Sequence, residues 1–384
     1  MSATGTGAVI AGIGHTEYSK NSGRSEMQLA AEASIAAIRD SWLEPSQIDG
    51  MVTFTIDEND EHTLMRNLGL TGLRFTARTP GGGGGSAATI QLAAAAVASG
   101  AANAVLVYRA FNERSGRRFG QPTGVDLSSL PPKMSWVLPY GVDTPAKMYS
   151  LWYQRYMHTY GVSNEDFGRY SVVARKHAAT NPNAWFYKRP ITLEDHQSSR
   201  WIVEPILRLL DCCQESDGGV AFVVTSEAQA KYLPSPLVRI VAAEQSHLQG
   251  GDELLDYYRG DRAIFPEADE LARRLYAASE LGPQDIDVAL IYENFSPVVF
   301  MQLESFGFCG RGEAKDFIAD GEIELGGAIP VNTNGGLLGE GYIHGLNNIV
   351  EAVRQIRGNA ANQVAGAQNV LVSAGRSGLV LSKG

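Results

Sequence analysis

The sequence predicts an α/β fold made of two similar halves, and two observations support this prediction. Segments typical of β-strands alternate with segments typical of amphipathic helices along the whole chain. In addition, residues 43–49 (LEPSQID) match residues 281–287 (LGPQDID) at four of seven positions, at the same place in the helix-to-strand order. Chance similarity explains this shared order poorly, so we interpret the two halves as an internal duplication.

Each half is expected to form three strands and two helices in the same order. The first half is predicted to contain a strand at 8–13, a helix at 26–42, a strand at 50–54, a helix at 86–97 and a strand at 104–107. The second half is predicted to contain a strand at 238–242, a helix at 268–279, a strand at 288–291, a helix at 345–356 and a strand at 370–372. We therefore expect two domains, 1–235 and 236–384.

The first domain contains a segment of different character at about 112–200, rich in Tyr, Trp, Pro and Arg. A long loop is expected at 111–139, followed by helices at 146–160 and 165–180. Long insertions in a compact scaffold usually carry substrate contacts, so this inserted loop domain is a candidate lid.

The composition excludes several functional classes. The chain has 384 residues and a formal net charge of −10, and no basic stripe is available for nucleic-acid phosphates. No apolar run reaches the roughly 18 residues of a membrane span, and the N-terminus lacks the pattern of a signal peptide. The three cysteines of the chain are too few and too irregularly spaced for a disulfide framework or a zinc site. We expect a cytoplasmic protein that binds neither nucleic acid, membrane nor metal.

A glycine-rich turn precedes the second helix of each half. The first is a run of glycines at 81–85, which lacks the Lys-Ser/Thr of a phosphate-binding loop and indicates close approach of the backbone to another group. The second, 334–345 (NGGLLGEGYIHG), places Tyr342 and His344 between glycines. Core packing alone explains such a tyrosine poorly, so Tyr342 is a candidate functional residue; His344 is either a site residue or a packed histidine.

A third candidate site follows the apolar strand predicted at 288–291. Tyr292, Glu293 and Asn294 come directly after it. Ligand-facing residues of open α/β folds gather at the carboxyl ends of strands, although Asn294 could also serve as a helix cap.

At these positions the sequence resembles the thiolase superfamily, in its sterol-carrier-protein-x or lipid-transfer branch, over the whole chain. The resemblance rests on several stretches taken together: 156–161 (YMHTYG), 177–182 (HAATNP), 210–213 (LDCC), 216–219 (SDGG) and 332–345. It implies a thiolase fold, with the two halves stacked in five layers in the order αβαβα.

The reactive positions of thiolases hold other residue types here. The Cys-Ala-Thr-Gly-Ser context of the nucleophile matches 82–86 (GGGGS), which puts Gly82 in place of the cysteine. The His-Asp-Cys-Phe motif matches 292–295 (YENF) and the Gly-His-Pro-x-Gly motif matches 341–345 (GYIHG), so both histidines have become tyrosines, Tyr292 and Tyr342. The C-terminal Cys-x-Gly matches 373–375 (SAG).

These changes favour carbon–carbon bond cleavage over acyl transfer, because a thioester intermediate requires a thiolate held near a base. The pair of tyrosines is similar to that of the steroid side-chain aldolases of this branch. That similarity implies retro-aldol cleavage of a 17-hydroxysteroid side-chain carboxyl-CoA to a 17-ketosteroid and propionyl-CoA. No cofactor is expected, since CoA is part of the substrate.

The resemblance also implies roles for individual residues. One tyrosine removes the proton of the C17 hydroxyl and the other protonates the carbon; we favour Tyr342 as the base and Tyr292 near the thioester, with the order left open. Asn294, His344 and the backbone amides near Gly82 and Gly375 are expected to bind the substrate and its enolate.

The expected partners come from the resemblance as well. It implies a homodimer that carries an accessory protein with an OB-fold and a zinc ribbon, together a heterotetramer. Two alternatives stay open: an acyltransferase or thiolase that uses Ser86 or Cys309 as nucleophile, and a non-catalytic subunit that only binds acyl-CoA.

Overall fold

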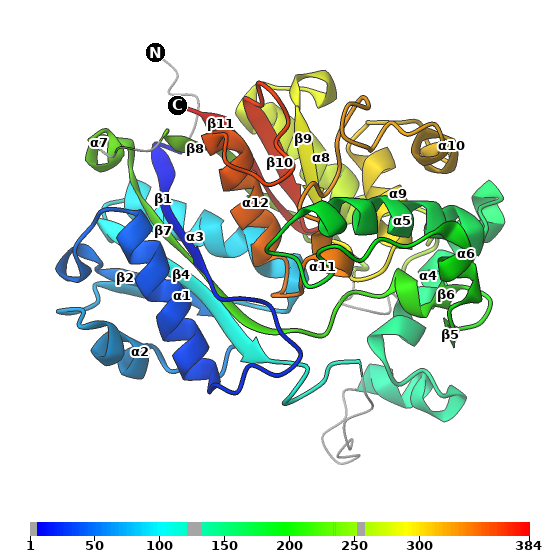
Figure 1. Ribbon diagram of the computed structural model, residues 1–384, viewed down its shortest axis with the longest axis horizontal. Coiled ribbons are helices and arrows are strands. Elements are labelled where there is room, and N and C mark those ends of the chain that lie inside the picture. Colours follow the sequence, from blue (N-terminus) through cyan, green and yellow to red (C-terminus); the bar gives the residue numbers. More distant parts are fainter. Residues whose placement is uncertain (1–5, 121–131, 233, 235, 252–257) are drawn as a thin grey trace.

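A computed structural model describes the chain except for residues 1–5, 121–131, 233, 235 and 252–257 (Figure 1). The strands are β1 (Ala8–His15), β2 (Gly50–Phe54), β3 (Phe75–Thr79), β4 (Ala104–Asn112), β5 (Trp201–Val203), β6 (Leu207–Arg208), β7 (Asp217–Ser226), β8 (Val238–Gln245), β9 (Val288–Ile291), β10 (Asn369–Ser373) and β11 (Ser377–Lys383). The helices are α1 (Glu26–Asp40), α2 (Glu61–Leu68), α3 (Ser86–Ala98), α4 (Pro145–Tyr160), α5 (Asn164–Thr180), α6 (Leu193–Ser198), α7 (Glu227–Ala230), α8 (Pro266–Ser279), α9 (Pro297–Ser305), α10 (Ala314–Ala319), α11 (Gly336–Gly339) and α12 (Leu346–Arg357).

The strands of both halves form one sheet in the order β3-β2-β4-β7-β1-β8-β11-β10-β9. The halves meet where β1 pairs with β8, through Val9 and Arg239. Outward from this junction, each half has two antiparallel pairings followed by a parallel one: β1-β7-β4-β2 in the first and β8-β11-β10-β9 in the second. β3 then pairs parallel to β2, and the parallel bridge between Ala289 and Val331 takes the equivalent place beside β9.

The repeated sequence motif makes the same contact in each half. The Asp49 carboxylate accepts hydrogen bonds from the amides of 103–104, at 2.7 and 3.0 Å, where β4 begins. The Asp287 carboxylate accepts hydrogen bonds from the amides of 368–369, both at 2.8 Å, where β10 begins. The matching aspartates of 43–49 and 281–287 therefore hold the starts of two equivalent strands, β4 and β10.

The molecule has five layers, because the two halves of the sheet form separate layers with helices outside and between them (Figure 1). α1 packs on the outer face of the first half and α8 on the outer face of the second, while α3 and α12 lie between the halves. Buried side chains separate accordingly into an outer core for each half and a central core that draws on both. The layering expected from the sequence is confirmed.

Each element predicted from the sequence is present, with shifts at its ends. The first helix ends at Asp40 rather than 42, and β4 continues to Asn112 instead of stopping at 107. Sequence reasoning did not assign β3, β7 or β11 as strands. β3 is an edge strand that is only half-buried, so the apolar pattern used to recognise strands is weak there.

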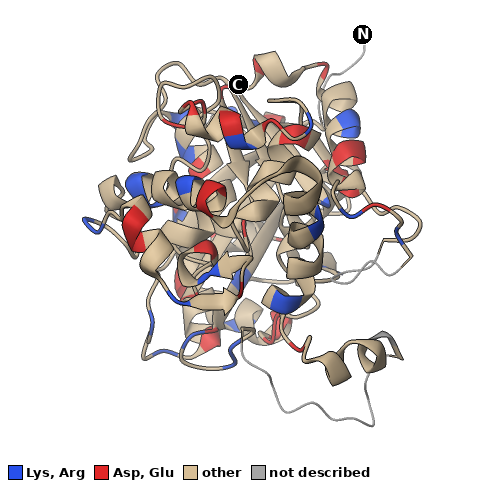
Figure 2. Cartoon of the chain, turned by 90° about the vertical axis from the view of Figure 1, so that its right-hand side faces the viewer, with Lys and Arg blue, Asp and Glu red and all other residues tan. Residues whose placement is uncertain are grey.

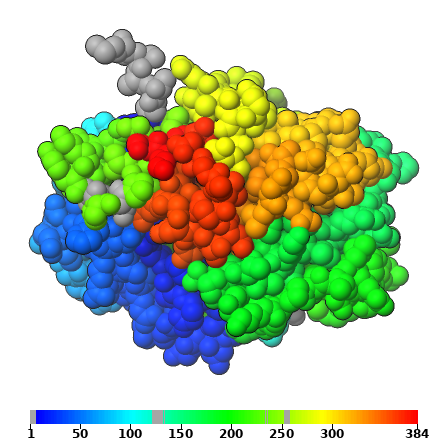
Figure 3. Space-filling model, turned by 45° about the horizontal axis from the view of Figure 1, so that its top comes forward, coloured from blue at the N-terminus to red at the C-terminus, as the bar shows by residue number. Residues whose placement is uncertain are grey.

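The insertion lies against both halves (Figure 3). Its two long helices, α4 and α5, occur where they are predicted. The long loop expected at 111–139 is interrupted by short 3₁₀ turns at Pro132–Trp136 and Leu138–Tyr140, and its part at 121–131 lies outside the described residues. α5 packs against α10 and α11 of the second half, which places the insertion beside the turn that carries Tyr342.

Acidic and basic residues are interspersed along the chain as it is coloured in Figure 2, without a long segment of one sign. Among the described residues, no helix combines the length and the apolar character needed to cross a membrane.

Candidate active site

The structure brings the two predicted tyrosines together. Tyr292 directly follows β9, and Tyr342 lies in the turn between α11 and α12. Their hydroxyl oxygens are 2.9 Å apart, within hydrogen-bond distance. A proton can therefore pass directly from one phenol to the other.

The backbone of Tyr292 is fixed from two sides. Its N–H donates to the carbonyl of Ser373 at the end of β10, at 2.7 Å, and its carbonyl accepts from the side-chain amide of Gln302, at 3.0 Å. The Ser373 hydroxyl in turn donates to the Gln302 amide oxygen, at 2.7 Å. Ser373 and Gln302 thus hold the tyrosine in place, whereas the Tyr342 N–H donates to the Ser216 hydroxyl, at 3.1 Å.

Burial raises the pKa of both phenols well above the usual value of 10. Among the smaller effects, their mutual hydrogen bond lowers the pKa of Tyr292 and raises that of Tyr342. Neither group can stand as a phenolate near neutral pH, so a proton taken up by one must be passed on.

The glycine turn before α3 makes room for these side chains. A Cβ atom at Gly83 would lie 2.0 Å from a ring carbon of Tyr292, so only glycine fits there. A Cβ atom at Gly82 would lie 3.5 Å from Nε2 of His344, an ordinary contact distance. Gly82, expected in place of the thiolase cysteine, therefore faces the histidine, and Gly83 faces Tyr292.

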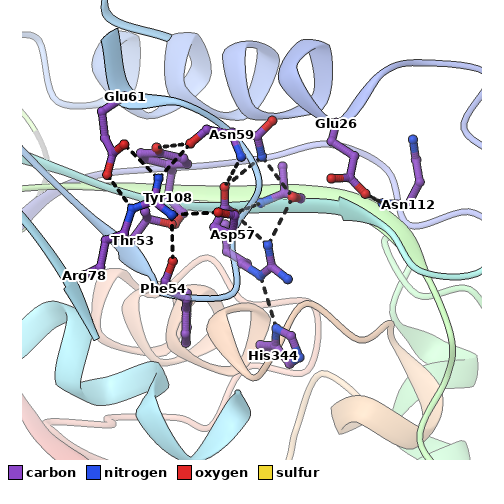
Figure 4. A network of polar contacts seen from close by, with 12 residues as sticks. Glu26, Thr53, Phe54, Asp57, Asn59, Glu61, Arg78, Tyr108, Asn112 and His344 are labelled. Carbon is purple, nitrogen blue, oxygen red and sulfur yellow. Dashed lines mark hydrogen bonds and ion pairs between the residues drawn. The ribbon is translucent and has the colours of Figure 1, made fainter. Parts of the chain in front are cut away.

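His344 is buried beside the tyrosine pair, and its backbone has φ +48°. Its ring stacks on Phe111 and packs edge-on against Tyr342, with ring centroids 4.9 and 5.2 Å away. Its Nδ1 accepts a hydrogen bond from the buried Arg109 (Figure 4). Burial, and then the charge of Arg109, lower the pKa of His344 well below 6.5, so the imidazole is neutral.

The other two predicted site residues have engaged backbones. Asn294 is half-buried, and its carbonyl accepts a hydrogen bond from the Cys213 N–H at 3.0 Å. Gly375 has φ +77°, and its N–H donates to the Ser373 hydroxyl at 3.1 Å, inside its own turn. Their roles toward the substrate stay predictions.

A cavity of about 300 Å³ opens beside His344. Phe111 and Phe119, whose rings pack on the imidazole, line it together with charged residues that include Arg109 and Glu113. Burial, and then the nearby Glu215, raise the pKa of Glu113 well above its usual value. A bound molecule in this cavity would contact the rings that support His344.

Among the described residues, no side chain with the properties of a nucleophile accompanies the tyrosines. Cys212 and Cys213 pack against the apolar cores, and burial raises the pKa of both thiols; it raises the pKa of Cys309 to about 12. Ser86 is buried at the start of α3, and no imidazole or carboxylate of the described residues hydrogen-bonds its hydroxyl. The part of the chain that the structure describes also contains no group of three or more His, Cys, Asp or Glu side chains placed to hold a metal ion.

Sequence reasoning missed Arg109, Gln302 and Gly83. Arg109 and Gln302 each interrupt an otherwise apolar run, VLVYRAF and VVFMQLE, and such an interruption marks a buried polar group that needs a partner. Gly83 could not be singled out, because nothing within a run of glycines indicates which of them packs against a side chain.

Comparisons with known proteins agree with the fold. Residues 258–383 match the family described as "Thiolase C-terminal domain-like". The chain is 54% identical to the steroid side-chain-cleaving aldolase of Thermomonospora curvata, over 99% of each chain. It is 52% identical to the 17-hydroxy-3-oxo-4-pregnene-20-carboxyl-CoA lyase of Mycobacterium tuberculosis, over 97% of this chain and 98% of the other.

Solved structures give the same result. The structure described as the Ltp2-ChsH2(DUF35) aldolase superposes with a TM-score of 0.93 and 54% identity, over 100% of this chain and 99% of the other. The human mitochondrial 3-ketoacyl-CoA thiolase has the same fold at 14% identity, with a TM-score of 0.66 over 98% of each chain. The chain therefore belongs to the thiolase superfamily, in the family of the steroid side-chain-cleaving aldolases.

Proposed function

We propose that this protein cleaves a 17-hydroxysteroid side-chain carboxyl-CoA by a retro-aldol reaction, giving a 17-ketosteroid and propionyl-CoA. The observation that carries the proposal is the pair of phenol hydroxyls 2.9 Å apart, beside a glycine turn that offers no nucleophile. The two relatives that are more than half identical support it, since one is named an aldolase for steroid side chains and the other a lyase for a 17-hydroxysteroid carboxyl-CoA.

The hydroxyl pair supports a proton relay. Tyr342 accepts the proton of the C17 hydroxyl while it passes its own proton to Tyr292. In the same step the C17–C20 bond breaks, its electron pair gives the thioester enolate character, and Tyr292 releases its own proton to C20 as it receives the one from Tyr342. Both phenols are neutral before and after the step, which fits pKa values raised well above 10. This order agrees with the one favoured from the sequence.

We also propose the partners. The solved relative is described as a complex of Ltp2 with ChsH2(DUF35), which supports an accessory subunit for this chain too. A homodimer core with two accessory chains, each with an OB-fold and a zinc ribbon, is the arrangement implied by the resemblance. Three free cysteines support a cytoplasmic location. No cofactor is required, because the relay and the thioester of the substrate supply the chemistry.

The test is the removal of each hydroxyl alone, in Tyr292→Phe and Tyr342→Phe. Each variant breaks the relay and is expected to lose at least about 100-fold in kcat while it still binds the acyl-CoA. Tyr276→Phe is the matched control, because it also removes a partly buried phenol that makes one hydrogen bond, at 2.8 Å to the carbonyl of Phe306, away from the site. Turnover near the wild-type value in both site variants would contradict the proposal. Binding without turnover by the wild-type complex would instead indicate a non-catalytic subunit.

A further inference from the structure

Arg109 is a fully buried arginine, 2% exposed, in the middle of the apolar strand β4. One end of its guanidinium is anchored: Nη1 donates to the carboxylate of Asp57 at 2.7 Å (Figure 4). Asp57 is itself held by two hydrogen bonds from Asn59, at 2.8 and 2.9 Å. The guanidinium therefore has a fixed orientation, set by a partner other than His344.

Its other edge determines the tautomer of His344. Nε of Arg109 lies 3.1 Å from Nδ1 of the imidazole. Arginine keeps its protons in proteins, so Nε is the donor and Nδ1 must be the acceptor. The ring proton of the neutral imidazole then resides on Nε2. An imidazolium would place two N–H groups and two positive charges against each other, which agrees with the lowered pKa of His344.

The Nε2–H group points at the glycine turn. A Cβ atom at Gly82 would be 3.5 Å from Nε2, and no hydrogen bond from the described residues reaches this nitrogen. The turn leads directly into α3, whose N-terminal amides carry partial positive charge. An oxygen that gains negative charge beside Gly82 would therefore meet a preoriented donor and the positive end of a helix.

We infer that Arg109 is a positioning residue that holds His344 as an Nε2–H donor to the thioester oxygen of the substrate. This inference rests on the proposed function and names one further contact within it. The C17 hydroxyl is engaged by the tyrosine relay, so the thioester oxygen is the acceptor left for this donor. The contact strengthens as that oxygen becomes the enolate oxygen, which is the condition for lowering the barrier.

The first test uses Arg109→Met, which removes the donor and keeps the chain length. We expect kcat to fall about 10- to 100-fold with a small change in KM. The ratio of variant to wild-type kcat should rise as pH falls from about 8 to about 5.5, because an imidazolium again presents an N–H group at Nε2. The ratio cancels the common dependence on the tyrosines. Besides Arg109, the rings that face the imidazole are those of Tyr342 and of Phe54, Phe111 and Phe119.

Arg78→Met is the matched control. Arg78 also holds the turn around Asp57, because it donates a 2.7 Å hydrogen bond to the backbone carbonyl of Asp57. It pairs with Glu61 and makes no contact with His344. The ratio of the Arg78→Met kcat to the wild-type kcat should be independent of pH. Because Arg109→Met leaves the buried Asp57 without its cation, the double variant Asp57→Asn/Arg109→Met provides a second form with no unpaired charge. It is expected to show the same rising ratio.

The second test isolates the thioester oxygen by binding alone. The full chain with its partner subunit is titrated with propionyl-CoA and with S-propyl-CoA, a thioether that lacks the carbonyl oxygen. Wild type should prefer propionyl-CoA, and the preference should fall by about 5- to 10-fold in Arg109→Met and remain in Arg78→Met. In wild type, ¹⁵N-histidine spectra should show His344 with Nδ1 unprotonated, and in Arg109→Met this signature should be lost.

These results separate the inference from the proposed function. Equal affinity of wild type for the two ligands would overturn the inference while cleavage by wild type stands. So would an Arg109→Met variant that keeps the wild-type ligand preference and whose kcat ratio to wild type is independent of pH. Failure of wild type to cleave a steroid acyl-CoA would overturn the proposed function, and the ligand preference and the spectra would still decide the role of Arg109.

Discussion

A single methyl group at Gly83 should disable the active site. In the structure a Cβ atom at this position would lie 2.0, 2.1 and 2.2 Å from Cε2, Cζ and the hydroxyl of Tyr292. Non-bonded carbon atoms are comfortable at about 3.5–4.0 Å, so the tyrosine ring must move by roughly 1.5 Å in Gly83→Ala. That displacement breaks the 2.9 Å contact to Tyr342.

The size of the effect follows from this geometry. Misplacement of a catalytic group by about 1 Å costs on the order of 100-fold in rate, so kcat for cleavage should fall by at least that factor. Overpacking should also lower the free energy of unfolding by about 1–3 kcal/mol. Neither effect requires backbone strain, because Gly83 lies in a 3₁₀ turn and its φ is not positive.

Gly84→Ala is the matched control in the same turn. Its Cβ atom would lie 3.9 Å from the carbonyl of Ala374 and 4.0 Å from Cβ of Arg376, which are ordinary contacts. We expect unchanged turnover and equal or slightly higher stability. The assay is steady-state cleavage of the steroid acyl-CoA, with thermal unfolding of each variant. Combining Gly83→Ala with Tyr292→Phe should lower kcat little more than either change alone. Wild-type turnover in Gly83→Ala would refute the placement of Tyr292 against the glycine turn.

The other predictions concern stability and the absence of covalent chemistry. Asp211→Ala removes the partner of His196 in a fully buried pair at 2.9 Å and should lower the free energy of unfolding by about 3 kcal/mol, measured by denaturant titration. Burial raises the pKa of Glu293 to about 8, above its usual 4.5, so its contribution to stability is complete below about pH 4.5 and is lost as pH rises through 8. Glu293→Gln, which keeps an acceptor for the Leu337 N–H, should therefore unfold at a higher temperature than wild type at pH 9 and at nearly the same temperature at pH 4.5; parallel curves would contradict this. Mass spectrometry after mixing with propionyl-CoA should show no acylated protein, since burial raises the pKa of Cys309 to about 12; an acyl adduct would revive the acyltransferase alternative.

The positions of the two candidate tyrosines could be predicted from sequence because local patterns mark them. Tyr292 ends an apolar strand, and Tyr342 stands between glycines that no core would require. The duplication could be recognised because Asp49 and Asp287 keep the same neighbours and make the same contact.

The contacts of the supporting residues could not be predicted from local patterns, because their partners are distant along the chain. The contact of Arg109 with His344 spans 235 residues, and it exists only after the two halves pack together. The same holds for the distance between Gly83 and Tyr292, which belong to different halves. The register of a five-glycine run is set only by what packs against it.

The central claim is that two phenols pass a proton from the steroid hydroxyl to carbon while the C17–C20 bond breaks. The most direct measurement incubates the chain and its partner subunit with a 17-hydroxysteroid carboxyl-CoA in D₂O and identifies both products by mass spectrometry. Equal amounts of a 17-ketosteroid and of propionyl-CoA carrying one deuterium at C2 are expected, with both products lost in Tyr292→Phe and Tyr342→Phe. Release of free CoA, transfer of the acyl group to the protein, or unchanged products in the two variants would contradict the claim.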